Sequence, residues 1–431
     1  MKPITNVATA LGVIFFGLWL NTASAQTYRP HFIGFLNENS PISVAYGIDE
    51  SGNAVGSSFY YGGGTDYGTR AVRWEFPNGP LVNLGILGGS NSAAYSINDE
   101  GVIAGESDIE LGVTQAIRIV DDTIEDLSTG RNLLRSTARG VNSWGAIVGY
   151  GVFSEESRSE LVRALWWSET TFLNLHNEFG FHPDSESWAF DCDSSENVVG
   201  TVRLLDSLRL LPSDGVAYWA KATLFGYDVT LIPMVEDFDF LSRAFGTCDE
   251  GFVAGYCSQD PEGTGFRRGF VWSSTTDALI NIGVLSGHPT NGASLLYAVN
   301  NRGQAVGFDG FDMESSLGIY DPWRGHGLRS LSDLVDPSEN LVILTAFDIN
   351  GSGLIAAWGA WGPPNEPVGV GVVLVPCYAD YNEDFVVDSQ DYSDFYSDYT
   401  SQNIKADINY DGVVSSQDFA TFLNYYNAGC D

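Results

Sequence analysis

The sequence is poor in basic residues. Its 431 residues include only 20 Lys and Arg against 55 Asp and Glu, which gives a formal net charge of −35. Lysine occurs three times, at Lys2, Lys221 and Lys405. A surface of this charge repels nucleic acids and anionic membranes and attracts divalent cations. We therefore expect no nucleic-acid partner, and the plainest interpretation of the acidity is solubility outside the cell.

Long apolar runs are absent except near the start. Residues 11–20 (LGVIFFGLWL) follow the positively charged Lys2, and the small-residue triplet ASA precedes Gln26, as in a secretory signal. The alternative is an uncleaved anchor, but the run is shorter than the roughly 20 residues that a membrane span needs. The sequence predicts a signal peptide over residues 1–25, secretion or attachment to the cell surface, and no transmembrane segment after cleavage.

Cysteine and histidine are scarce, with five of each. No CxxC, HExxH or GxSxG motif and no Cys/His metal spacing occurs. Disulfides are permitted in an exported protein. Cys377 and Cys430 bracket the C-terminal segment and are the predicted pair. Cys192 and Cys248 are a second candidate bridge, between neighbouring repeats, which leaves Cys257 unpaired.

A twelve-residue hairpin phrase occurs seven times. In its second copy, Asn98 opens a tight turn and Gly101 closes it, between two short apolar strands. Glu196 replaces the turn glycine in the fourth copy, and Ala357 replaces the final glycine in the seventh. The copies are AYGIDESGNAVG (45–56), AYSINDEGVIAG (94–105), ARGVNSWGAIVG (138–149), AFDCDSSENVVG (189–200), AFGTCDEGFVAG (244–255), LYAVNNRGQAVG (296–307) and AFDINGSGLIAA (346–357).

Each hairpin is followed by two further strand signals, such as RAVRW (70–74) and LVNLGIL (81–87). Four short strands in each unit of about 50 residues is the content of a propeller blade. The first hairpin is preceded by an unpaired fourth-strand phrase, HFIGFL (31–36), and the last is followed by a third-strand phrase, VGVGVVLV (368–375). Joining these two ends removes the open sheet edges. We predict an all-β, closed seven-bladed propeller over residues 29–375, rather than an open solenoid with polar caps.

These phrases resemble the HAF-repeat family of extracellular β-propeller-like proteins over nearly the whole segment. The family's His-Ala-Phe is absent, because its His position holds Arg70, Gln115, Arg163 or Arg268. The resemblance implies a fold and an extracellular place. It implies little about activity, since the family is defined by its repeat.

The last part of the chain carries two loops with the ligand order of a twelve-residue Ca²⁺ loop. Phe385 stands in the first loop where a glycine normally makes a sharp turn, which predicts a weaker or distorted first site. Two Asp-rich turns without metal are the alternative. The predicted oxygen ligands of two Ca²⁺ ions are Asp380, Asn382, Asp384, the Val386 carbonyl, Asp388 and Asp391, then Asp407, Asn409, Asp411, the Val413 carbonyl, Ser415 and Asp418.

Each loop runs into a helix-like segment, and the segment ends in Asn427-Ala428-Gly429-Cys430. Residues 377–431 resemble dockerin domains, in particular those of the GC type (type I dockerin-like). The resemblance implies a small all-α domain with two EF-hand-type Ca²⁺ loops and a cohesin-like or cell-envelope partner. It also implies that the residues facing the partner are Ser389, Gln390, Ser416 and Gln417. The alternative is that the Ser and Asp residues at these positions simply start the helices as N-caps.

No catalytic constellation stands out. The Asp or Asn that opens six of the seven turns suggests a ring of ligands, but turn formation already explains it (Asp49, Asn98, Asn142, Asp193, Asn300, Asn350). Acidic clusters that would suit glycoside hydrolysis are expected by chance in so acidic a chain (Glu236, Asp237 and Asp239; Glu155, Glu156 and Glu160). We expect a non-enzymatic binding or structural protein with a polysaccharide or protein ligand on the propeller. The alternative is a secreted polysaccharide hydrolase or lyase.

Overall fold

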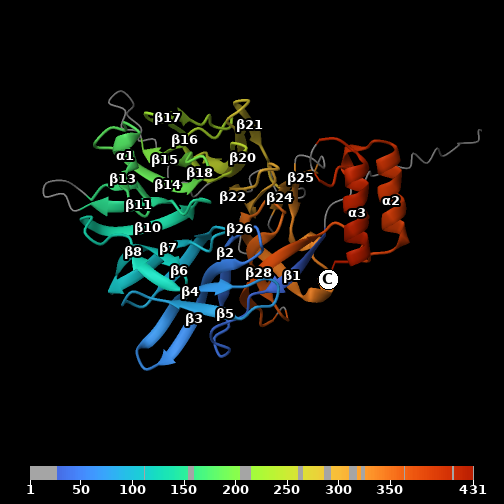
Figure 1. The fold of residues 1–431 in the computed structure, drawn as a ribbon, viewed down its shortest axis with the longest axis horizontal. Helices are drawn as coiled ribbons and strands as arrows, with labels where there is room; N and C mark the ends of the chain where they lie inside the picture. The colour runs from blue at the N-terminus through green and yellow to red at the C-terminus, as the bar shows by residue number, and fades with distance from the viewer. Residues whose placement is uncertain are drawn as a thin grey trace, which may run out of the picture.

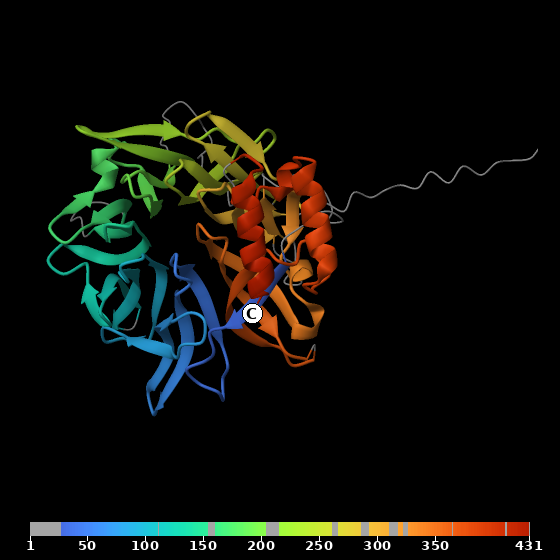
Figure 2. The same cartoon turned by 45° about the vertical axis from the view of Figure 1, so that its right-hand side comes forward.

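Seven four-stranded antiparallel sheets form a ring in the structure (Figure 1 and Figure 2). The structure is a computed structural model. Each of the seven sheets is called a blade below. The predicted seven-bladed propeller is confirmed, and the core lies in layers of apolar side chains between neighbouring blades. The described residues are 27–110, 112–153, 160–203, 215–260, 266–285, 293–309, 318–321, 326–363, 365–409 and 412–430.

The blades follow one another along the chain, each starting with its innermost strand. Blades 1 to 3 consist of β2 (Ser43–Ile48), β3 (Ala54–Gly63), β4 (Asp66–Trp74) and β5 (Leu81–Gly85); β6 (Ser92–Ile97), β7 (Ile103–Glu110), β8 (Val113–Val120) and β9 (Thr123–Asp126); and β10 (Leu133–Val141), β11 (Ile147–Phe153), β12 (Val162–Trp167) and β13 (Phe172–Asn174). Blades 4 to 6 consist of β14 (Glu186–Cys192), β15 (Val198–Arg203), β16 (Val216–Thr223) and β17 (Gly226–Leu231); β18 (Leu241–Thr247), β19 (Phe252–Ser258), β20 (Arg267–Ser273) and β21 (Ala278–Asn281); and β22 (Ser294–Val299), β23 (Ala305–Asp309), β24 (Gly318–Asp321) and β25 (His326–Ser330).

Blade 7 closes the ring with strands from both ends of the repeat segment. It consists of β26 (Leu341–Ile349), β27 (Ile355–Trp361), β28 (Val368–Cys377) and, on its outer edge, β1 (Thr27–Phe32). The predicted closure is confirmed, since β1 pairs antiparallel with β28 from Thr27 opposite Cys377 to Phe32 opposite Val372. The strand begins four residues before the phrase at 31–36 and overlaps it only at its start, and it ends shortly before Gly34, which has φ 81°.

The seven hairpin phrases are the two innermost strands of the seven blades. The first and twelfth residues of each phrase face each other, as Ala45 and Gly56 do in blade 1. A Cβ built on Gly56 would lie 1.8 Å from the carbonyl oxygen of Val44, so the final glycine permits this close approach. In blade 7, where Ala357 replaces the glycine, β26 has a second irregularity between Ile343 and Thr345.

A buried serine on the innermost strand joins most blades to the one before. The Ser242 hydroxyl accepts a 2.8 Å hydrogen bond from the backbone N–H of Ala217, across the boundary between blades 4 and 5. Ser43 accepts from Gly371 in the same way across the closing boundary. These serine staples occur at six of the seven boundaries (Ser43, Ser92, Ser136, Ser187, Ser242 and Ser294).

Helices are few and mostly C-terminal. A short α1 (Leu175–Glu178) and the 3-10 turns η1 (Ser332–Leu334) and η2 (Pro337–Glu339) lie between strands of the ring. After β28 come α2 (Ser389–Thr400), η3 (Ile404–Ala406) and α3 (Ser416–Ala428). The helices α2 and α3 lie outside the ring beside the closing blade (Figure 1 and Figure 2). None of the helices in the described part of the chain is long and apolar enough to cross a membrane.

The C-terminal helices pack on each other through aromatic side chains, and they are attached to the propeller. Phe395 and Phe422 stack at a centroid distance of 4.0 Å. The predicted Cys377–Cys430 disulfide is confirmed, and it ties the end of α3 to the end of β28. The hydroxyl of Thr27 on β1 also donates a 2.7 Å hydrogen bond to Asp380.

The second candidate bridge, between Cys192 and Cys248, is wrong. Cys192, Cys248 and Cys257 are all free and buried thiols. Cys192 packs in the core between blades 3 and 4, near the Ala146 carbonyl, whereas Cys248 lies at the turn of blade 5. The two thiols therefore face different surroundings.

Candidate functional site in the central channel

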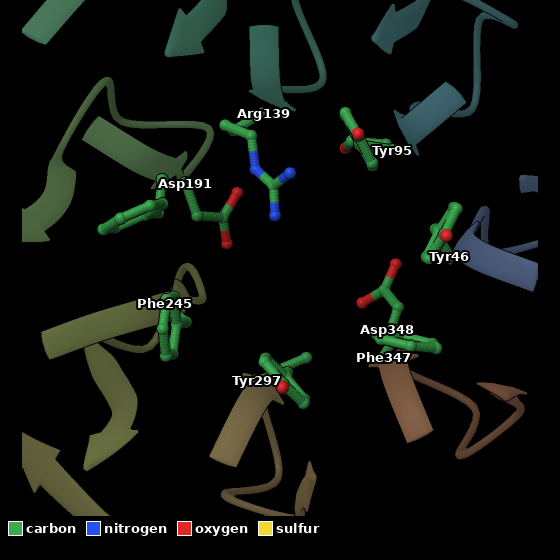
Figure 3. A pocket seen from close by; sticks show the side chains of 11 residues that line it. Tyr46, Tyr95, Arg139, Asp191, Phe245, Tyr297, Phe347 and Asp348 are labelled. Carbon is green, nitrogen blue, oxygen red and sulfur yellow. The ribbon is translucent and has the colours of Figure 1, made fainter. Parts of the chain in front are cut away.

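The innermost strands surround a channel whose wall is largely aromatic. The second residue of each hairpin phrase points into this channel, where it lines a cavity of about 310 Å³ (Figure 3). Because the phrase repeats, these seven side chains form one level of the channel, which we call the collar. The collar consists of Tyr46, Tyr95, Arg139, Phe190, Phe245, Tyr297 and Phe347.

The collar rings touch one another around most of the channel. Ring centroids of neighbouring blades are 5.4 Å apart for Tyr46–Tyr95 and 5.0 Å for Tyr46–Phe347. The contacts continue through Tyr297 and Phe245 to the ring of Phe190. Such mutual packing fixes the rings in tilted or edge-to-face arrangements. The collar is therefore a preformed, largely aromatic surface.

Arg139 replaces an aromatic ring at the third collar position. Its guanidinium carbon lies 4.2 Å from the centroid of the Tyr95 ring, within the range of a cation–π interaction. The Tyr95 hydroxyl donates a 2.7 Å hydrogen bond to Glu106, which anchors that ring from behind. The collar thus already holds one cation against an aromatic face.

Two carboxylates lie next to the collar on opposite sides of the channel, Asp191 of blade 4 and Asp348 of blade 7 (Figure 3). They occupy the third position of the hairpin phrase, which is Gly, Ala or Ser in the other five blades. Both also line the continuation of the channel, a cavity of about 430 Å³ toward the hairpin turns. They therefore stand between the two cavities.

The two aspartates are held in the same way. Asp191 accepts hydrogen bonds from the backbone N–H of Cys192 at 2.9 Å and of Thr247, in the next blade, at 3.0 Å. Asp348 accepts from Ile349 at 2.9 Å and from Ile48, again in the next blade, at 3.0 Å. A carboxylate oxygen that accepts one of these hydrogen bonds can still accept another, because it has a second lone pair. Both groups can therefore join blades and still face a ligand.

Burial makes these two acids weak. Desolvation raises the pKa of Asp191 to about 7, and the nearby charge of Asp348 acts in the same direction. Desolvation also raises the pKa of Asp348, to about 6. Perturbed acids in a concave site are a common sign of function, although they also occur in structural networks.

The Asp and Asn residues that open the hairpin turns act as turn formers, as predicted. The Asn98 side chain accepts hydrogen bonds from the backbone N–H of Glu100 and Val102. Its amide also donates to the carbonyl of Asn142 in the next blade at 2.9 Å. The same bond recurs from Asn142, Asn300 and Asn350, so these side chains join neighbouring turns while their residues line the second channel cavity.

The described members of the acidic clusters named from the sequence lie away from the channel. Glu236, Asp237 and Asp239 are exposed in the connection after β17 and line neither channel cavity. Glu160 is exposed and pairs with Arg135 at 3.2 Å. Glu155 and Glu156 lie outside the described residues. Among the clustered acids that the structure describes, none is therefore placed in the channel.

A serine–histidine contact occurs within the described part of the chain, but it is inaccessible. His176 Nδ1 lies 2.8 Å from the hydroxyl oxygen of Ser187, and His176 Nε2 lies 3.0 Å from the His182 carbonyl. Ser187 is completely buried as one of the serine staples. Burial lowers the pKa of His176 to about 4. A substrate has no path to this pair.

The predicted first calcium loop is folded around two buried carboxylates. Asp380 accepts hydrogen bonds from the backbone N–H of Asp384 and Phe385, and Asp391 accepts from those of Asn382 and Asp388. Phe385 adopts φ 67°, so the sharp turn normally made by glycine is formed. Burial raises the pKa of Asp391.

The second loop has the same design. Asp407 accepts from the backbone N–H of Gly412, which has φ 83°. Asp418 accepts from Asn409 and Ser415. Asp411 lies outside the described residues, and among those that are described no group of three or more His, Cys, Asp and Glu side chains has the arrangement of a metal site.

The helix caps are Asp388 and Ser415, one residue before the expected starts. Each forms a capping box with the aspartate three residues later. The residues assigned to a partner surface follow these caps, and all four are exposed (Ser389, Gln390, Ser416 and Gln417).

Sequence reasoning missed the channel residues themselves. When the seven copies are aligned, their second position holds six aromatic residues and one arginine, although the phrase needs no large side chain there. Their third position holds a small residue except at Asp191 and Asp348. These two columns were a usable signal, because residues at equivalent positions of propeller blades meet around one axis.

No family model and no curated protein sequence matches the chain. Among solved structures, the β-propeller domain of the Trilobed protease from Pyrococcus furiosus, described as having an open velcro topology, is similar at a TM-score of 0.50 and 8% identity, over 79% of this chain and 99% of that one. A prolyl endopeptidase structure is similar at a TM-score of 0.50 and 10% identity, over 81% of this chain and 50% of that one. Aleuria aurantia lectin bound to α-methyl-L-fucoside follows at a TM-score of 0.34 and 8% identity, over 81% and 96%. At such identities the likeness concerns the propeller fold alone.

Proposed function

We propose that the chain is an exported, non-enzymatic binding and structural protein that takes its ligand in the propeller channel. The observation that carries this proposal is the collar: a preformed aromatic surface beside two fixed carboxylates, in a cavity of about 310 Å³. Ligand sites are typically concave and apolar with a few convergent polar groups. The polysaccharide or protein ligand expected from the sequence would enter with a sugar or a side chain.

We further propose that residues 377–431 form a dockerin-like module that attaches the propeller to a cohesin-like or cell-envelope partner. Two Ca²⁺ ions would be held by the twelve loop residues named above, in a shell of oxygen ligands that Ca²⁺ prefers. The four buried aspartates and the two sharp turns support this fit. The bound ions would order the loops, so that Ser389, Gln390, Ser416 and Gln417 face the partner.

A polysaccharide hydrolase or lyase is the second candidate. It is favoured by Asp191 and Asp348, two carboxylates with raised pKa values in one channel. Enzymes that cleave glycosidic bonds commonly use a pair of carboxyl groups. The backbone hydrogen bonds of both groups to the next blade favour the binding role instead.

One experiment separates the two candidates. The purified protein is incubated with a panel of polysaccharides, and both retention on the polymer and release of reducing ends are measured. Retention without turnover is expected. Turnover that survives purification and disappears in Asp191→Asn or Asp348→Asn would establish the enzyme. A panel with neither retention nor turnover, repeated with extracellular protein extracts, would remove the support for a channel ligand of these classes.

A further inference from the structure

We propose that the channel binds an organic cation, a ligand with a primary or quaternary ammonium group, and that the charge sits beside Asp348. The inference rests on the proposed binding function of the channel and names the chemistry of its ligand. It follows from the difference between the two halves of the channel.

The half around Asp348 is an aromatic cage. Phe347 of the same blade, Tyr46 of the next blade and Tyr297 of the preceding blade surround the carboxylate (Figure 3). The centroid of Phe347 lies 5.0 Å from that of Tyr46 and 5.6 Å from that of Tyr297. Aromatic faces carry negative potential and attract cations, most strongly where water is excluded. A carboxylate within such a cage supplies the counter-charge.

The half around Asp191 has the same backbone design but is already filled. In the preceding blade, the collar residue is Arg139, at the position that Tyr297 occupies relative to Asp348. The Arg139 guanidinium lies over Tyr95 and points into the channel beside Asp191 (Figure 3). The chain therefore supplies its own cation to one half of the channel. Neither Asp191 nor Asp348 forms an ion pair within the residues that the structure describes, so the two halves differ in the nearby Arg139 guanidinium and not in a salt bridge.

The charge balance favours a cationic ligand over a neutral one. The two aspartates lie on opposite sides of the channel, and the charge of Asp348 disfavours ionisation of Asp191. Arg139 supplies one positive charge for two carboxylates. An ammonium group beside Asp348 would remove this imbalance, which a neutral sugar would not do. The overall charge of −35 also concentrates cations near the protein.

The first test uses the wild-type full chain and two probes of equal shape. Choline is titrated against the protein by isothermal calorimetry at fixed ionic strength, and its uncharged carbon isostere, 3,3-dimethylbutan-1-ol, is titrated in parallel. We expect one choline site, and binding of the alcohol weaker by about tenfold or more, as loss of a cation–π contact and an ion pair predicts. A methyl glycoside serves as the neutral sugar probe and is expected not to compete.

Matched substitutions test the two halves. Asp348→Asn keeps the acceptor for Ile48 and should weaken choline binding by about tenfold, whereas Asp191→Asn should leave it within about twofold. Tyr297→Arg gives the Asp348 half its own cation and should abolish binding. Arg139→Tyr removes the cation from the Asp191 half and should raise the stoichiometry from one site to two. Circular dichroism and melting temperature identify any variant that does not fold.

Equal affinity for choline and its isostere, displacement of choline by the glycoside, or unchanged binding in a folded Asp348→Asn variant would overturn the inference. Absence of choline binding to the wild-type protein would overturn it as well. Those results leave the proposed binding function standing if a polysaccharide or protein ligand is retained in the panel experiment.

Discussion

The side-chain amide of Asn350 donates a 2.9 Å hydrogen bond to the backbone carbonyl of Asp49, 301 positions earlier in the chain. It is the same bond that Asn98 makes to Asn142 between blades 2 and 3. The closing boundary of the ring is therefore built like an interior boundary. Ser43 adds the matching serine staple to Gly371 there.

The turn asparagines can be tested for their two roles separately. Asn98→Asp keeps the acceptor that forms the turn but removes the donor to Asn142, so the free energy of unfolding should fall by about 1 kcal/mol. Asn98→Ala removes both roles and should cost about 2–3 kcal/mol. Urea denaturation provides the measurement. Asp49→Asn makes the reverse change: it adds a donor toward the next blade but removes the acceptor of the Asn53 side-chain amide, so its net effect should be smaller than that of Asn98→Ala. An Asn98→Asp variant as stable as the wild type would contradict the inter-blade role.

The buried serine staples should each contribute measurably to the free energy of unfolding. Ser242→Ala leaves the backbone N–H of Ala217 buried without its acceptor, which should lower the free energy of unfolding by about 1–3 kcal/mol. Ser274, whose side chain lies in the connection after β20, is the control position for the same substitution. Thermal or urea unfolding gives the comparison. A loss no larger than that of the control would show that the staple does not stabilise the ring.

The channel acids should make stability depend on pH. The pKa of Asp191 is raised from 3.8 to about 7 and that of Asp348 to about 6, so the folded protein binds more protons than the unfolded chain between about pH 4 and 7. Their contribution is present below pH 4 and is lost as the pH rises through 6 to 7. Asp191→Asn should therefore gain stability relative to wild type on going from pH 4.5 to 7.5, by on the order of 2 kcal/mol.

Wild type must be compared with Asp191→Asn because His176 changes the free energy of unfolding with pH in the opposite direction. Burial lowers its pKa from 6.5 to about 4, so its contribution is lost as the pH falls through the same window. The difference between wild type and Asp191→Asn cancels this effect. A pH-independent difference would show that Asp191 titrates normally in the folded protein.

Calcium and the disulfide should act on the C-terminal helices and not on the blades. We expect chelation with EGTA to reduce the helical circular dichroism signal. We expect the double substitution Cys377→Ser and Cys430→Ser to lower the free energy of unfolding of this segment by about 2–4 kcal/mol. In both cases the unfolding transition of the propeller should stay in place. Intact-mass analysis before and after reduction verifies the bond. An unchanged helical signal after EGTA would refute ion binding there.

How much could be predicted from the sequence depended on the type of interaction. The repeated turn residues and the unpaired phrases at both ends gave the seven blades, because turn chemistry and sheet closure are local or topological properties. The Cys377–Cys430 pair followed from position in the chain. The collar, Asp191 and Asp348 were not identified, because their meeting depends on the radius of the ring and on which face of the innermost strand lines it. The predicted Cys192–Cys248 bridge was wrong for a related reason. The sequence does not show that one thiol packs in the core between blades 3 and 4 while the other lies at the turn of blade 5.

The position of β1 on the outer edge of blade 7 has a consequence for biosynthesis. During translation, Thr27 leaves the ribosome some 350 residues before its partner Cys377, as their separation in the sequence requires. Domains with such distant pairings fold late, because the loop must close before the contacts form. The first strand to be synthesised, β1, can pair only with the last, β28. Nascent chains of every intermediate length therefore expose an unpaired strand edge that is paired in the finished molecule.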